Sequence, residues 1–222
     1  MTRRFDRFWG KIMISAGVLV LLVSAGLLAY NIWDNNRAAE STARVTRLLF
    51  EQIEISGKNH DSGLDSPTAG QSEEDLPPEQ TQDDNFLDSA NTPVSALFDG
   101  ERYIGILSIP SLSLELPVNY NWDYNKLKKT PCRYAGGIND SLVIAGHNYR
   151  NHFNPLTRLR IGDSVMLTDM AGVEHLYKVE KIETMSATDI AGMLDRSYDL
   201  TLFTCNYSGM ARVAIRCVRH NP

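Results

Sequence analysis

Short apolar segments recur from residue 101 to the end of the chain, separated by turn-forming residues such as Gly, Pro, Asn, Asp and Ser. They are rich in β-branched and aromatic residues and are five to ten residues long, which indicates β-strands. Many strands and few helices in ~120 residues predict one all-β-dominated domain, a barrel or a sandwich with its own core. The expected strands are 103–109, 114–120, 141–146, 164–168, 175–184, 198–205 and 212–219, with short helical pieces near 123–129, 152–159 and 189–196.

An apolar run near the N-terminus, residues 12–30, contains no charged residue. About 19 residues of helix, at 1.5 Å each, span a hydrocarbon core of roughly 30 Å. Four basic residues precede the run, so the N-terminus is expected in the cytoplasm and the bulk of the chain outside the cell. A cleaved signal peptide is the alternative, but its apolar region is shorter and usually ends in a small-residue cleavage site. We predict a cytoplasmic basic N-terminus, 1–11, and an uncleaved transmembrane signal-anchor, 12–33, with Trp33 at the membrane interface.

The residues between this span and the β-rich region fall into two parts. Residues 34–55 contain good helix formers, and we interpret them as a membrane-proximal helix that serves as a spacer. Residues 56–98 are dominated by Ser, Asp, Glu, Gln, Gly and Pro. Such a composition cannot bury enough apolar area to offset chain entropy, which predicts an acidic disordered linker. The folded domain is therefore expected at 99–222.

Overall composition limits the partners and the chemistry. A formal charge of −5 and an isoelectric point near 5.5 argue against a nucleic-acid partner. The three cysteines are Cys132, Cys205 and Cys217, and an odd count in an exported chain leaves at least one free thiol. Cys132 and Cys217 could pair or stay free, and packing is the expected role of Cys217.

Two neighbouring apolar segments bring a thiol and a guanidinium together. Cys205 ends one segment and Arg212 opens the next, so an antiparallel hairpin places them side by side. Arg216 would lie about 13 Å further along, in an ion pair or on a solvated face. A nearby guanidinium favours the nucleophilic thiolate. His147 follows the segment 141–146, and of the five histidines it is the best placed to act as the base that a thiolate needs.

These residues resemble those of the sortases, the cysteine transpeptidases of Gram-positive bacterial surfaces. Residues 201–205 match the family's TLxTC motif, 145–148 match its histidine segment, and Arg212 matches its arginine. The resemblance extends over roughly residues 100–220, and includes 103–110, similar to the first barrel strand, and 153–163, similar to an "F…L…L…GD" stretch.

The resemblance implies an eight-stranded β-barrel with short helices, and a membrane-anchored enzyme whose catalytic domain is extracellular. Cys205 would cleave an LPxTG-like sorting signal through a thioester. His147 would protonate the leaving amine and then deprotonate an incoming one, while Arg212 would hold substrate and stabilise the oxyanion. The implied partners are sorting-signal peptides of exported surface proteins and an amine acceptor, such as a peptidoglycan precursor or a pilin lysine. The sortase class stays open.

Two other functions remain as alternatives: a thiol peptidase that hydrolyses such signals, and a membrane-tethered surface scaffold with a lapsed site. No cofactor is expected. Cysteines and histidines lack the spacing of zinc ligands. Some sortases bind calcium through acidic residues near the groove. Acidic residues are available here, but their spacing does not define a site: Glu174, Glu180, Glu183 and Asp189.

Overall fold

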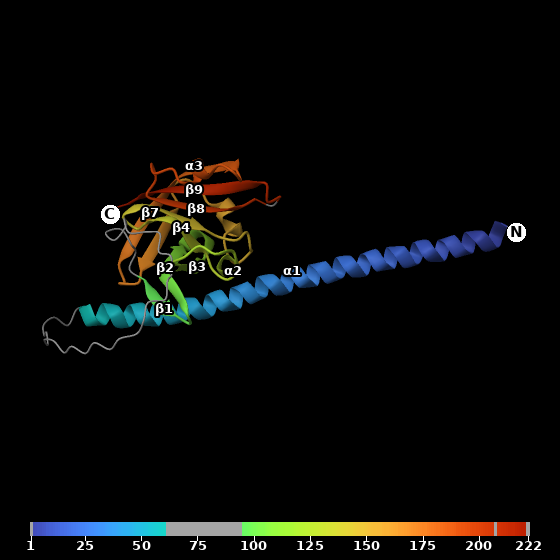
Figure 1. The fold of residues 1–222 in the computed structure, drawn as a ribbon, viewed down its shortest axis with the longest axis horizontal. Helices are drawn as coiled ribbons and strands as arrows, with labels where there is room; N and C mark the ends of the chain where they lie inside the picture. Colours follow the sequence, from blue (N-terminus) through green and yellow to red (C-terminus); the bar gives the residue numbers. More distant parts are fainter. Residues whose placement is uncertain (1, 61–94, 207, 221–222) are drawn as a thin grey trace, which may run out of the picture.

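The computed structural model describes residues 2–60, 95–206 and 208–220. A long helix, α1 (Thr2–His60), runs along one side of a β-barrel and projects far beyond it at the N-terminal end (Figure 1). Its segment Met13–Trp33 has 21 residues and a mean hydropathy of 2.2, and none of it is buried against the rest of the protein. Among the described residues, this is the one segment long and apolar enough to cross a membrane. The predicted span and the predicted membrane-proximal helix are therefore parts of one continuous helix.

The β-rich region forms a closed eight-stranded barrel, so the fold class is confirmed. Neighbouring strands follow the order β2-β3-β4-β5-β8-β9-β7-β6, and β6 pairs back with β2 to close the sheet. A short additional strand, β1, pairs with β2. Helix α3 lies on the side of the barrel opposite α1 (Figure 1). The bounds are β1 Ala96–Phe98, β2 Glu101–Ile109, η1 Pro110–Leu112, β3 Leu114–Asn119, α2 Tyr124–Leu127, β4 Cys132–Gly137, β5 Asp140–Ala145, η2 Asn154–Arg158, β6 Ser164–Asp169, β7 Glu174–Ser186, α3 Ile190–Met193, β8 Leu200–Cys205 and β9 Ala211–Arg219.

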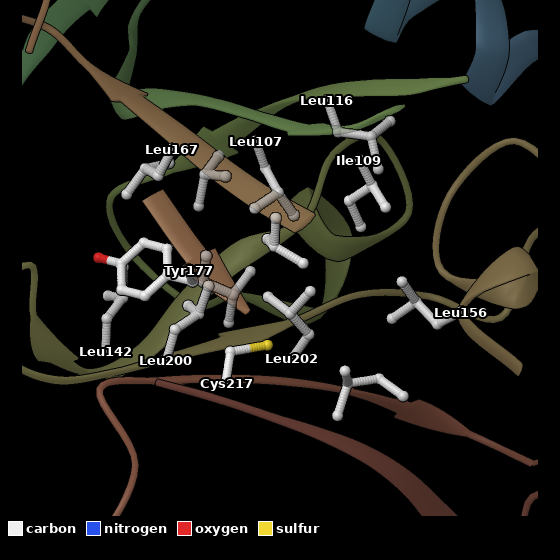
Figure 2. Close-up of a cluster of buried hydrophobic side chains, with 14 of the residues drawn as sticks. Leu107, Ile109, Leu116, Leu142, Leu156, Leu167, Tyr177, Leu200, Leu202 and Cys217 are labelled. Atoms are coloured by element: carbon white, nitrogen blue, oxygen red, sulfur yellow. The ribbon is translucent and has the colours of Figure 1, made fainter. Parts of the chain in front are cut away.

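Apolar side chains from alternate strand positions fill the barrel interior. Figure 2 shows Leu107 and Leu167 on one side of this core and Leu202 and Cys217 on the other. The "F…L…L…GD" stretch contributes to this core through Phe153, Leu156 and Leu159. Its Asp163 accepts a hydrogen bond from the backbone N–H of Arg160 at 2.9 Å and so closes the following turn. This stretch therefore stabilises the barrel.

The C-terminal half of α1 packs against the barrel. Leu49 and Ile53 are buried with Tyr103 and Ile106 of β2 and with Met170. Burying such a side chain contributes about 2 kcal/mol. The buried positions of the helix, 42, 46, 49 and 53, recur at helical spacing and form one contact face. The spacer interpretation of residues 34–55 is therefore wrong, because this part of the helix is a packing partner of the barrel.

Most of the predicted linker, residues 56–98, lies outside the described residues. Its two ends have regular structure, since α1 continues to His60 and β1 pairs with β2. Ala96 and Phe98 pack against the cluster that contains Leu49. The folded unit therefore begins before residue 99, because contacts with α1 and β2 hold this short strand in place.

Strand β4 is absent from the strands that the sequence predicts. Its pairing with β5 is interrupted between Arg133 and Ala135 and again between Ala135 and Gly137. Gly136 has a φ of +68°, and a Cβ there would lie only 2.1 Å from the carbonyl oxygen of Ser141. Such irregularities remove the strict alternation that marks a strand in a sequence.

Candidate active site

Strands β8 and β9 form an antiparallel hairpin in which Cys205 lies directly opposite Arg212. The turn between them is closed by Asn206. Its backbone N–H donates to the carbonyl oxygen of Ala211 at 2.9 Å, and its side-chain oxygen accepts from the N–H of Ala211 at 3.2 Å. Residues directly opposite on paired strands have Cα atoms about 5 Å apart. The predicted placement of Cys205 and Arg212 side by side on adjacent strands is confirmed.

The two arginines of β9 have different surroundings. The Arg212 guanidinium is partly exposed, and one of its nitrogens donates to the carbonyl oxygen of Gly209 at 3.1 Å. Arg216 is 1% exposed and is bonded to Glu183 at 2.9 Å and to Thr201 Oγ1 at 3.0 Å. Arg216 therefore belongs to a structural ion pair, which is one of the two roles left open by the sequence, and Arg212 is the more accessible arginine of β9.

The parallel pairing of β5 with β8 brings His147 to the same end of the sheet. Ala145 is opposite Phe203, and the N–H of Gly146 donates to the carbonyl oxygen of Phe203 at 3.0 Å. His147 lies two residues after Ala145, and Cys205 lies two residues after Phe203. Because parallel neighbours advance in step, His147 and Cys205 emerge from adjacent positions at one edge of the barrel.

A tight loop holds His147 after β5. The N–H of Phe153 donates to the carbonyl oxygen of His147 at 3.2 Å, which closes the loop. A Cβ at Gly146 would lie 2.2 Å from the Phe153 ring, so only glycine allows this close approach. The imidazole of His147 stacks on the ring of Tyr149, with centroids 4.0 Å apart and an interplanar angle of 7°. The small residue before the histidine is thus required by packing.

Accessibility separates the three cysteines. All three are free, so Cys132 and Cys217 do not form a disulfide. Burial raises the pKa of both of these thiols to about 12, which keeps them protonated and unreactive at neutral pH. Cys205 is partly exposed and faces Arg212. It is the one thiol that a peptide can approach.

The sortase domain family model matches residues 107–220, just over half of the chain. The chain belongs to the sortase family. No curated protein matches it.

Solved sortase structures are similar to this chain at low sequence identity. A sortase D5 transpeptidase of Clostridium perfringens is 18% identical, with a TM-score of 0.50 over 57% of this chain and 83% of that one. Sortase C1 of Streptococcus agalactiae is 23% identical, with a TM-score of 0.49 over 56% and 71%. Sortase A of Listeria monocytogenes is 20% identical, with a TM-score of 0.49 over 54% and 88%.

Next to the hairpin, this sortase has a buried apolar cluster on the outer face of the barrel sheet. Val143 and Ala145 of β5, Phe203 of β8 and Ala214 of β9 lie together there, and Met193 of α3 packs on them. Tyr134 packs edge-on against Phe203 with ring centroids 5.2 Å apart. This second cluster lies on the opposite side of the sheet from the barrel core and borders Cys205 along β8.

His152 is a buried residue near the site that sequence reasoning passed over. It is 0% exposed and lies beneath α1, where its Nε2 is 3.1 Å from Thr42 Oγ1. Burial, together with the charge of the neighbouring His147, lowers its pKa to about 4. His152 is therefore neutral at physiological pH. The spacing of Thr42 and Thr46 with Leu49 and Ile53 on one helix face was the available sequence signal for this contact.

The low pKa of His152 predicts an acid-sensitive fold. The unfolded chain, with an ordinary histidine pKa near 6.5, binds more protons than the folded chain below that pH. Stability should therefore fall from about pH 6.5 toward pH 4, by about 3 kcal/mol in total for this group. Urea unfolding of the full-length protein in detergent should show this loss in the wild type and a weaker loss in His152→Gln. Equal pH dependence in the two proteins would contradict the prediction.

Acidic side chains do not gather into a metal site in the part of the chain that the structure describes, where no group of three or more His, Cys, Asp or Glu side chains could hold an ion. Two of the acidic residues considered above have structural partners. Glu183 binds Lys181 as well as Arg216, and Asp189 caps α3 by accepting from the N–H of Gly192 at 2.9 Å.

Proposed function

We propose that this sortase is a cysteine transpeptidase in which Cys205 is the nucleophile, His147 the general acid and base, and Arg212 the group that binds the developing oxyanion. The supporting observation is the hairpin geometry: the one partly exposed thiol of the chain lies opposite a partly exposed arginine. The histidine segment enters the same edge through the β5–β8 pairing.

The reaction proceeds in two half-reactions. The Cys205 thiolate attacks the carbonyl carbon of the scissile peptide bond, and Arg212 stabilises the negative charge on the carbonyl oxygen. The imidazolium of His147 gives its proton to the leaving amine, and a thioester on Cys205 remains. An incoming amine then attacks the thioester, His147 removes a proton from that amine, and the thiolate is released with a new amide bond.

The proposed binding site for the peptide lies beside the hairpin, over the partly buried side chains of Tyr134, Ala135 and Met185 that pack on the apolar cluster of the outer face. Met185 of β7 is opposite Arg212 of β9, so this surface leads to the edge that carries Arg212 and Cys205. A peptide with leucine and proline ahead of the scissile bond, as in an LPxTG-like signal, would bury apolar side chains here. The polar end of the peptide would then reach Cys205 and Arg212.

The proposed enzyme is a single-pass membrane protein with its catalytic domain outside the cell. The apolar segment Met13–Trp33 and the basic residues before it support this topology. The β8–β9 turn lies at the end of the barrel that faces the N-terminal part of α1 (Figure 1). The catalytic edge would therefore face the membrane, from which exported substrates and lipid-linked acceptors, such as a peptidoglycan precursor, emerge. A pilin lysine is the alternative acceptor.

Product analysis tests transfer against hydrolysis. The full-length protein, in detergent, is incubated with a library of LPxTG-like peptides, with and without a small primary amine, and the products are identified by mass spectrometry. A transpeptidase should form the amide of the acyl fragment when the amine is present, at the expense of the free acid. A product mixture of free acid alone, unchanged by the amine, would favour the thiol peptidase. No cleavage of any peptide would favour the lapsed scaffold.

A further inference from the structure

A chain of contacts links α1 to His147. Thr42 Oγ1, on α1, lies 3.1 Å from His152 Nε2. The His152 ring packs on Tyr149 with centroids 5.6 Å apart. Tyr149 in turn stacks on His147 with centroids 4.0 Å apart. Three successive side-chain contacts thus connect the helix to the proposed catalytic histidine.

Hydrogen bonding determines which nitrogen of the buried His152 ring carries the proton. The Thr42 hydroxyl donates its only proton to the carbonyl oxygen of Lys129 at 2.8 Å. The contact with His152 must therefore be an Nε2–H donated to Thr42 Oγ1, which makes His152 the neutral Nε2–H tautomer. Its Nδ1 has no hydrogen-bond partner within the described structure, so the ring is oriented through Nε2, which contacts Thr42 Oγ1 and also interacts with the Lys129 backbone carbonyl.

The loop between the two histidines is too tight to absorb a shift of one without moving the other. The N–H of His152 donates to the carbonyl oxygen of Tyr149 at 3.0 Å, and the N–H of Phe153 donates to that of His147 at 3.2 Å. Phe153 is itself buried in the barrel core. A rotation of the His152 ring would therefore be passed through Tyr149 to the His147 imidazole.

We propose that Thr42 and His152 are positioning residues for His147, so that the helix which carries the candidate membrane span is also part of the active site. This inference rests on the proposed role of His147 as acid and base. It explains why a buried histidine with an unpartnered nitrogen is placed between α1 and the catalytic loop. An apolar side chain would pack there without the cost of burying polar atoms.

The test compares Thr42→Val with Thr46→Val in the full-length protein in detergent. Valine at 42 keeps the shape of threonine but removes the oxygen that contacts His152 Nε2. Thr46 is a matched control: it is also buried on the same helix face, and its hydroxyl donates to the carbonyl oxygen of Thr42 at 2.9 Å without contacting His152. Thr42→Ser restores the hydroxyl. His152→Gln removes the ring that contacts Tyr149 and serves as a second variant.

Steady-state kinetics with a cleavable peptide identified by the library should separate positioning from stability. Thr42→Val and His152→Gln should lower kcat by about 10-fold with little change in KM, since a small misplacement of a catalytic group is costly. Thr42→Ser and Thr46→Val should stay within about twofold. The NMR signals of the His147 imidazole in ¹³C-histidine-labelled protein should move in Thr42→Val but not in Thr46→Val.

Two outcomes would overturn the inference. One is equal kcat and unchanged His147 signals in Thr42→Val and Thr46→Val, with thermal unfolding confirming that both are folded. The other is a Thr42→Ser variant as impaired as Thr42→Val. If instead His147→Ala cleaves the peptide at the wild-type rate, then the proposed function itself fails, whatever the Thr42 variants do.

Discussion

Cys205→Ala is expected to remove turnover of the sorting-signal peptide, with a loss of at least about 1,000-fold. The acyl group needs a sulfur, and the other two thiols are buried and held protonated by a pKa of about 12. Cys205 is partly exposed at a strand end, so its side chain contributes little to the core. The rate of peptide cleavage, measured by chromatography on folded protein, checks this result.

The matched controls are Cys132→Ser and Cys217→Ala. Serine at 132 can still donate to the carbonyl oxygen of Thr130, which the thiol contacts at 3.5 Å. Alanine at 217 leaves a small cavity in the barrel core and should lower stability rather than turnover. Cleavage by Cys205→Ala at a rate near that of these controls would refute the assignment.

His147→Ala should lower kcat by about 100- to 10,000-fold, because both proton transfers pass through one imidazole. Protonation of the leaving amine and deprotonation of the incoming amine would both be lost. The neighbouring His152 cannot take over these proton transfers, because burial lowers its pKa to about 4. Its ring also lies beneath α1, in contact with Thr42. Single-turnover measurements of thioester formation and of its aminolysis should both be slow in this variant.

His220→Ala is the control for the loss of a histidine. His220 is exposed, and its structural contact is the backbone N–H that donates to the carbonyl oxygen of Leu176 at 2.8 Å, which alanine retains. This variant should keep the wild-type rate. A His147→Ala protein that forms and resolves the thioester as fast as His220→Ala would show that another group moves the protons.

Much of the barrel follows from the sequence, because most of its strands are short apolar, β-branched segments that end at clear turn residues. The hairpin argument placed Arg212 opposite Cys205, which the structure confirms, and left Arg216 in an ion pair or on a solvated face, of which the structure shows the ion pair. This success has a simple physical basis: two strands joined by a short turn have a defined register.

The features that the sequence does not predict depend on tertiary contacts. Strand β4 is hidden by its irregular pairing and by Gly136, which breaks the alternation. The docking of α1 is easily missed despite the helical spacing of its buried positions, because two of the four are threonine, a residue usually found at the surface. Burial of Thr42 depends on a partner for its hydroxyl, the carbonyl oxygen of Lys129. His152 is similar: a histidine in a short helical segment gives no sign of burial until the helix that covers it is placed.

The most direct test of the central claim is to locate the thioester. The wild-type protein is mixed with a cleavable sorting-signal peptide without an amine, quenched in acid, digested and analysed by mass spectrometry. The acyl fragment should be found on the peptide that contains Cys205, and it should disappear as an amide forms when an amine is added before the quench. An acyl group on Cys132 or Cys217, or cleavage with no acyl-enzyme at all, would contradict the account.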